Sequence, residues 1–168
     1  MMKALIVVDM QKDFVDGALG TKEAEAIVEN VKKKIEDCRR AGMQIIFTRD
    51  THPENYLETY EGKHLPVTHC VEGTEGWAID SRLTVDEKDI VVNKPTFGYL
   101  GWNTYDFEEV EIIGLCTDIC VISNALIIRA MNPEMDITVT ANCCAGVTPE
   151  THNAALATMK MCQIQVVE

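Results

Sequence analysis

The sequence predicts a three-layer α/β fold, in which helices cover both faces of a mostly parallel, Rossmann-like six-stranded sheet. Short segments of continuous apolar character alternate with segments whose apolar residues have helical spacing, and this alternation is typical of parallel sheets. The 168 residues suffice for one domain with a hydrophobic core. No repeat or linker interrupts the pattern, so we expect a single domain over residues 1–168.

Six segments are predicted as strands, because each is short and rich in branched apolar residues: 4–9, 44–49, 89–93, 110–114, 136–141 and 163–167. Residues 21–41 form the first long helix, which ends at Gly42. Residues 50–87 form a long polar connection with a short helix expected over 77–83. Connections of this length are usually functional.

Two more helices follow the central strands. Thr117 or Asp118 is expected as the N-cap of a helix that runs to about residue 130. Residues 94–103 before it form a loop rich in glycine and aromatic side chains. Thr148 and Pro149 are expected to open the last helix, as its N-cap and its first-turn proline.

Charge and cysteine content exclude several classes of function. The formal net charge of -12 argues against nucleic acid and against anionic membrane surfaces. No apolar run approaches the roughly 18 residues that a membrane span needs. Seven cysteines, an odd number, do not resemble a secreted disulfide scaffold. We therefore expect a cytoplasmic protein that binds neither nucleic acid nor membrane.

Chemically reactive side chains fall at the carboxyl ends of the first four predicted strands. Asp9, Asp50 and Lys94 end the first three, and Cys120 lies in the first helical turn after the fourth. Ligands of such sheets bind at this edge. A helix N-terminus stabilises a thiolate, and a thiol, an acid and a lysine are the components of nucleophilic acyl transfer. The alternatives are a turn-capping Asp9, a solvated Lys94 and a core thiol at Cys120.

A second group of polar residues lies in the long connection. Asp50 and His52 point the same way in an extended segment, and further donors follow downstream: Glu61, His64 and His69. Carboxylate and imidazole donors suit zinc, iron or manganese. A polar surface loop is the alternative interpretation.

At these residues the sequence resembles the isochorismatase-like cysteine hydrolases, and within them the nicotinamidases. Residues 4–14, ALIVVDMQKDF, are similar to the first strand of the family and its general base. Residues 94–99, KPTFGY, fall where the family has its lysine, and GLCTDICV at 114–121 resembles the nucleophile motif. Residues 50–53, DTHP, and 69–76, HCVEGTEG, resemble the metal-binding segments of nicotinamidases.

The resemblance implies an isochorismatase-like hydrolase fold and a cysteine mechanism on a small amide such as nicotinamide. Cys120 would attack the amide carbon to form a thioester, Asp9 would take the thiol proton, and Lys94 would hold charge nearby. The peptide bond between Leu115 and Cys116 would be cis. The N–H groups of Cys116 and Cys120 would form the oxyanion hole.

The resemblance also implies one divalent transition metal, bound by Asp50, His52 and His69. Glu61 is expected as a fourth ligand, with His64 as the alternative. Zinc is the expected metal, and iron and manganese are the alternatives. The metal would hold the ring nitrogen of the substrate, which is a positioning role.

The substrate wall differs from that of many nicotinamidases, because Leu65 stands where they often have an aromatic residue. We expect Phe14, Leu65, Phe97 and Tyr99 to contact the substrate, with Trp102 as another candidate. We also expect a homo-oligomer.

Three other functions stay open at this point. One is a cysteine hydrolase acting on another small amide or carbamoyl compound. The second is a non-catalytic binding protein on the same fold, and the third is the metal-free and cysteine-free reaction of the isochorismatases.

Overall fold

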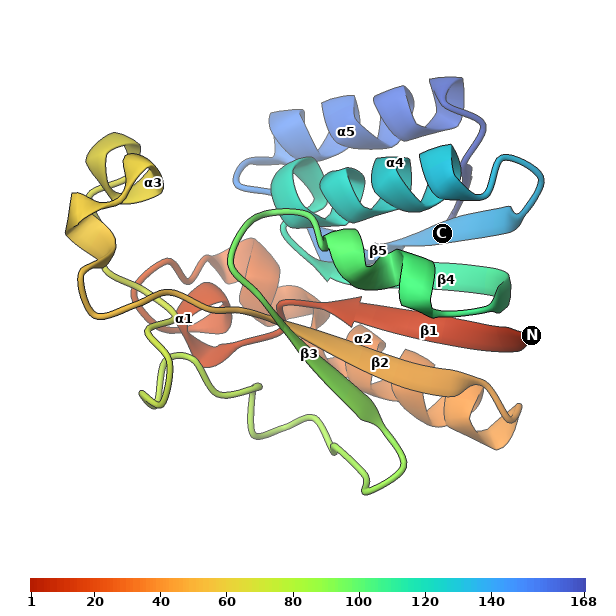
Figure 1. The fold of residues 1–168 in the computed structure, drawn as a ribbon, viewed down its shortest axis with the longest axis horizontal. Coiled ribbons are helices and arrows are strands. Elements are labelled where there is room, and N and C mark those ends of the chain that lie inside the picture. Colours follow the sequence, from red (N-terminus) through yellow and green to blue (C-terminus); the bar gives the residue numbers. More distant parts are fainter.

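A computed structural model describes residues 1–168 and has one six-stranded sheet at its centre (Figure 1). The strand order is β3-β2-β1-β4-β5-β6, and every neighbouring pair is parallel. The strands are β1 (Met2–Val8), β2 (Gln44–Asp50), β3 (Ile90–Lys94), β4 (Phe107–Leu115), β5 (Asp136–Ala145) and β6 (Gln165–Val167). The predicted fold class is confirmed.

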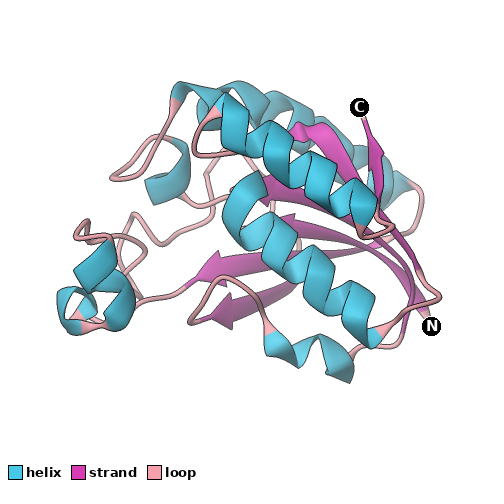
Figure 2. Ribbon diagram, turned by 90° about the horizontal axis from the view of Figure 1, so that it is seen from above, coloured by secondary structure: helices cyan, strands magenta, loops and turns pink.

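Helices cover both faces of the sheet. The α-helices are α1 (Lys12–Val15), α2 (Lys22–Arg40), α3 (Tyr60–His64), α4 (Ile122–Met131) and α5 (Pro149–Met161). Three short turns complete the set: the 3-10 turns η1 (Tyr56–Glu58) and η2 (Leu100–Thr104), and the π-helical turn η3 (Thr117–Val121). Helices α4 and α5 lie on one face and α2 on the other (Figures 1 and 2). Such coverage allows strands without a polar face.

Strand β1 shows the consequence of this double coverage. Its last five residues, 4–8, are completely buried. Leu5 and Val7 belong to the core formed with α2, whereas Ala4, Ile6 and Val8 belong to the core on the side of α4. Burying a side chain of this size stabilises the fold by about 1.5–3 kcal/mol. The position of β1 at the centre of the sheet is therefore strongly specified.

Two local predictions are wrong. Residues 77–83 form no helix, because Ile79 forms an isolated β-bridge with Gln11 and Arg82 pairs with Asp80. Neither Thr117 nor Asp118 caps the helix after β4. The Thr117 hydroxyl is hydrogen-bonded to a histidine of α5, and the Asp118 carboxylate accepts the N–H of a residue in the β5–α5 loop.

Other termini are as predicted. The Thr148 hydroxyl accepts the backbone N–H of Thr151, and Pro149 is the first residue of α5. Gly42, after α2, has a φ of +79°, a conformation that favours glycine.

None of the helices has the length and apolar character that crossing a bilayer requires.

Candidate active site

Lys94 ends β3, the outermost strand on one side of the sheet, and its side chain is fully buried. Its Nζ is 2.6 Å from Asp9 Oδ2, 3.5 Å from Cys120 Sγ and 3.7 Å from Asp50 Oδ1. It also donates to the carbonyl of Thr96 at 3.1 Å. The structure thus brings together the four residues at the ends of the first strands, and Lys94 is not a solvated loop residue.

Asp9 is a buried acid at the turn after β1. Its backbone has a φ of +47°, in the left-handed region that aspartate tolerates better than most residues. Thr48 of the neighbouring strand donates its hydroxyl to Asp9 Oδ1 at 2.6 Å. Burial raises the pKa of Asp9, and the Lys94 ammonium opposes that shift. A carboxylate with a raised pKa is better able to accept a proton from a thiol.

Cys120 is placed by the π-helical turn η3 rather than by an α-helical first turn, and it is 4% exposed. The Cys116 carbonyl accepts the N–H groups of both Ile119 and Val121, which widens this turn. Burial and then the Asp9 carboxylate raise the pKa of the Cys120 thiol well above its ordinary value, against the opposing effect of Lys94. The thiol is therefore protonated at rest and needs a base to become a nucleophile.

The backbone before η3 has two unusual features. The Leu115–Cys116 peptide bond is cis, as the family resemblance implies. Gly114 has a φ of +117°, and a Cβ there would lie 2.2 Å from the Val8 carbonyl oxygen, so only glycine fits. The backbone N–H of Cys116 donates no hydrogen bond. It is therefore free to donate to a ligand beside the thiol.

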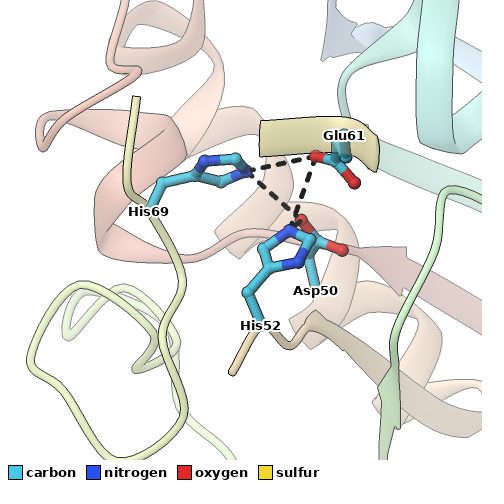
Figure 3. A group of neighbouring side chains, drawn as sticks. All are labelled: Asp50, His52, Glu61 and His69. Atoms are coloured by element: carbon cyan, nitrogen blue, oxygen red, sulfur yellow. Dashed lines mark hydrogen bonds and ion pairs between the residues drawn. The ribbon is translucent and has the colours of Figure 1, made fainter. Parts of the chain in front are cut away.

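Four donors from the long connection converge next to this group (Figure 3). His52 Nε2 is 2.9 Å from Asp50 Oδ2 and 3.5 Å from Glu61 Oε1. His69 Nε2 is 3.6 Å from Asp50 Oδ2 and 3.7 Å from Glu61 Oε1. His64 is exposed and bonds the Tyr60 carbonyl instead, so Glu61 is the fourth member of the cluster.

The ligand atoms of the cluster all lie within 4.8 Å of one another, and three of the distances above approach those of a tetrahedral metal site. Bonds of about 2.0–2.2 Å separate the ligands of a tetrahedral centre by about 3.3–3.6 Å, close to most of these distances. His69 Nδ1 must donate to the Val67 carbonyl at 2.7 Å, which leaves the Nε2 lone pair directed at the cluster. Although burial opposes ionisation, His52 and His69 hold the pKa of Asp50 well below its usual range. The donor set fits a divalent transition metal.

Short local elements supply the ligands. Asp50 is held by Gln11, a buried side chain that accepts the Asp50 N–H at 2.7 Å and donates to the Asp50 carbonyl at 2.9 Å. Glu61 comes from α3, whose N-cap Thr59 accepts the N–H of Gly62. Sequence reasoning missed both Gln11 and α3. The only sequence signal for Gln11 is a polar residue just after an apolar strand. The only signal for α3 is Thr59, a residue type that favours helix N-caps.

One cavity of about 230 Å³ connects the two groups. Its lining includes Cys116 and Cys120 together with Asp50, Glu61 and His69. The rest of the wall is mostly apolar: Phe14, Leu19, Thr21, Leu65, Phe97, Ile119 and Val147.

Three of the four expected substrate contacts, Phe14, Leu65 and Phe97, line this cavity, and Tyr99 does not. The Tyr99 ring packs edge-on against buried Trp102, which also stays outside the cavity. Apolar packing on the α4 side of the sheet therefore takes both rings away from the substrate.

Known proteins that are similar to this chain in sequence or structure include several amide hydrolases. A nicotinamidase from Escherichia coli is 27% identical over 95% of this chain and 90% of its own length. The crystal structure of a Pyrococcus horikoshii pyrazinamidase in complex with zinc is 30% identical, with a TM-score of 0.86 over 100% of this chain and 99% of that one. An N-carbamoylsarcosine amidase from Thermoplasma acidophilum is 25% identical, with a TM-score of 0.82 over 100% and 96% of the two chains. The isochorismatase domain family matches residues 3–168, so the chain belongs to that family, as a member of the nicotinamidase type.

Proposed function

We propose that the protein hydrolyses nicotinamide to nicotinate and ammonia through a thioester on Cys120. One observation carries this proposal: a single small cavity is lined both by Cys120 and by three of the four metal-type donors, Asp50, Glu61 and His69. A flat ring bound at Asp50, Glu61 and His69 would present its carboxamide to Cys120. The apolar walls suit an aromatic ring rather than a charged or extended substrate.

The chemistry begins with proton transfer from Cys120 to Asp9. The sulfur attacks the amide carbon, and the tetrahedral intermediate collapses as the amine leaves with the proton that Asp9 took. Water then attacks the thioester, with Asp9 again as the base, and the product acid and the free thiol are released. Each proton that Asp9 accepts is passed on, so the site returns to its starting state.

Charge is stabilised on both sides of the reacting carbon. The Lys94 ammonium, 3.5 Å from the sulfur, stabilises the thiolate as it forms. The N–H groups of Cys116 and Cys120 are proposed to receive the developing oxyanion, and the free N–H of Cys116 supports this role. Losing one such donor costs about 3–4 kcal/mol of barrier in other enzymes.

Asp50, His52, Glu61 and His69 are proposed to hold one transition metal, and zinc is the ion found with the Pyrococcus horikoshii relative. When bound, the metal supplies a Lewis-acid position for the pyridine nitrogen of the substrate, and its contribution is orientation. The four-donor set with two histidines favours zinc over magnesium or calcium.

A second candidate substrate is another small amide or carbamoyl compound. The observation in its favour is that most apolar lining residues, including Leu65 and Val147, are aliphatic, and that Phe14 and Phe97 supply the only phenyl rings of the lining. N-carbamoylsarcosine, the substrate in the name of one structural relative, is the compound to compare.

Ammonia release by the purified protein decides between these substrates. Nicotinamide and N-carbamoylsarcosine are assayed side by side, with and without chelator, and Cys120→Ala serves as the blank. We expect nicotinamide hydrolysis that chelator reduces. Hydrolysis of the carbamoyl compound alone would identify the second function, and activity on neither would reject both.

We also propose a cytoplasmic location and self-association. All seven cysteines are free, which suits a reducing compartment. Fractionation of the source cells and light scattering of the purified protein test these two points.

A further inference from the structure

A buried amide side chain lies one helical turn beyond the nucleophile. Asn124, in the first turn of α4, is completely buried. Its Oδ1 accepts the backbone N–H of Tyr99 at 2.9 Å and the indole N–H of Trp102 at 2.8 Å. Its Nδ2 donates to the carbonyls of Cys120 at 2.8 Å and Phe97 at 3.2 Å.

These four bonds use the entire hydrogen-bonding capacity of an amide, which has two donor hydrogens and two acceptor lone pairs. Rotating the amide by half a turn would place its NH₂ against two N–H donors. The orientation of Asn124 is therefore fixed by its partners. A fully satisfied buried polar group of this kind specifies the arrangement of the segments that it joins.

Both segments joined by Asn124 contribute to the lining of the substrate cavity. Cys120 carries the thiol, and Phe97 is a wall of the same cavity. Residues 95–99 between β3 and η2 have no helical or strand structure of their own. The position of the Phe97 wall relative to the sulfur therefore depends on the bonds that Asn124 makes.

Other contacts hold the loop, and one of them also reaches the thiol. Lys94 Nζ binds the Thr96 carbonyl and lies 3.5 Å from Cys120 Sγ, and a Cβ at Gly98 would lie 2.4 Å from Ile127 Cδ1 of α4. Neither contact involves the Cys120 backbone. Asn124 is the side chain that bonds both the nucleophile turn and the Phe97 backbone.

We propose that Asn124 is a positioning residue, which fixes the position of the Phe97 backbone relative to η3, the turn that carries Cys120. Asn124 then links the placement of the Phe97 wall to that of the thiol through the backbones of both segments. A displacement of about 1 Å at such a site can cost about 100-fold in rate. The expected change in turnover rests on the proposed nicotinamide hydrolysis. The expected change in the accessibility of the Cys120 thiol does not.

Two substitutions separate the two halves of the link. Asn124→Ala removes all four bonds. Asn124→Ser keeps a hydroxyl that can bond the carbonyl four residues earlier in a helix, which is that of Cys120, but cannot reach the loop. Thr140→Val is the matched control, because Thr140 is equally buried and bonds Glu111 outside the cavity.

We expect kcat/KM of Asn124→Ala to fall by roughly 10- to 100-fold, with both kcat and KM affected. Asn124→Ser should raise KM while kcat stays within about threefold of the wild type, since only the wall is released. Thr140→Val should leave kcat/KM within about twofold, even where its thermal midpoint falls as far as that of the Asn124 variants.

Alkylation of Cys120 by iodoacetamide, located by peptide mass spectrometry, gives a readout without substrate. The rate should rise in Asn124→Ala, because the thiol is only 4% exposed in the intact turn, and should stay near the wild-type value in Asn124→Ser. Equal alkylation rates in the wild type, Asn124→Ala and Asn124→Ser would overturn the proposal. Equal values of kcat/KM for Asn124→Ala and Thr140→Val would also overturn it. If the wild type releases no ammonia from nicotinamide, the proposed function fails, and the alkylation rates still decide the role of Asn124.

Discussion

Replacing Lys94 by methionine should destabilise the fold as well as stop turnover. The Lys94 ammonium and the Asp9 carboxylate are both completely buried and lie 2.6 Å apart. With an effective dielectric constant of about 20, Coulomb's law gives an attraction of about 6 kcal/mol at this distance. Part of this attraction offsets the cost of taking both charges out of water, so the pair contributes much less than the full value.

Removing only one partner is more costly than removing the pair. Lys94→Met leaves the Asp9 carboxylate buried without its cation, a change that typically costs about 3–5 kcal/mol. For a domain of this size, each kcal/mol lowers the thermal midpoint by about 2–4 °C, so we expect a decrease of roughly 6–20 °C. The double variant Asp9→Asn/Lys94→Met removes both charges and should recover most of the loss.

The destabilisation should depend on pH with a defined sign. Burial raises the pKa of Asp9, and Lys94 is the main group that opposes the shift. In Lys94→Met the folded-state pKa of Asp9 therefore lies further above its unfolded value. Stability is then fully present below the unfolded pKa and is lost as pH rises through the folded pKa, by at most about 1.4 kcal/mol per pH unit.

Urea denaturation of metal-free protein at pH 5 and pH 8 measures this effect. The loss of unfolding free energy in Lys94→Met, relative to the wild type, should be larger at pH 8. A loss below about 1 kcal/mol at both pH values would refute the reasoning, since a buried unpaired carboxylate must cost more. A double variant no more stable than Lys94→Met would also refute it.

The remaining predictions concern turnover and metal binding. Cys120→Ala should abolish ammonia release with the circular dichroism spectrum unchanged, whereas Cys116→Ala, which keeps its backbone N–H, should remain active; near-wild-type activity of Cys120→Ala would make this thiol a core residue. Asp9→Asn should be nearly inactive, because an amide cannot accept the thiol proton, and its turnover at the wild-type rate would assign the base elsewhere. Elemental analysis of protein purified without chelator should find roughly one transition metal per chain, and His52→Ala should lose it; no metal, and no binding of added zinc, manganese or iron, would contradict the metal site. His52→Ala should raise KM for nicotinamide yet retain hydrolysis of a non-pyridine amide that the wild type accepts, and complete loss on both substrates would show that the metal takes part in bond breaking.

The sheet and the convergence of the reactive residues could be predicted, because both depend on regular patterns. Apolar runs mark buried strands, and the carboxyl ends of parallel strands share one edge. Asp9, Asp50, Lys94 and Cys120 therefore meet wherever the strand order puts their strands side by side. Their roles in catalysis stay predictions.

The less regular parts of the site could not be predicted, for reasons specific to each. Helix α3, which carries Glu61, has five residues and depends on its Thr59 cap and on packing near Tyr56, so no periodic signal exists. The π-helical turn has five residues and is closed by a shared acceptor at Cys116, which is too short a segment to carry a periodic signal. Asn124 lies in an apolar helical segment, and three of its four hydrogen-bond partners are more than 20 residues away in sequence.

The four donors of the metal-type cluster lie within residues 50–69, at the end of β2 and in the connection to β3, whereas the acid, the lysine and the thiol lie at or just after the ends of β1, β3 and β4. The metal-type donors therefore lie in one continuous stretch of sequence that contains none of Asp9, Lys94 and Cys120. On the proposed assignment, exchange of residues 50–69 would remove or install the metal site and leave β1, β4 and the nucleophile turn unchanged. A scaffold built in this way could then acquire new substrates by loop exchange, because the proposed acyl-transfer residues would not have to change with the substrate.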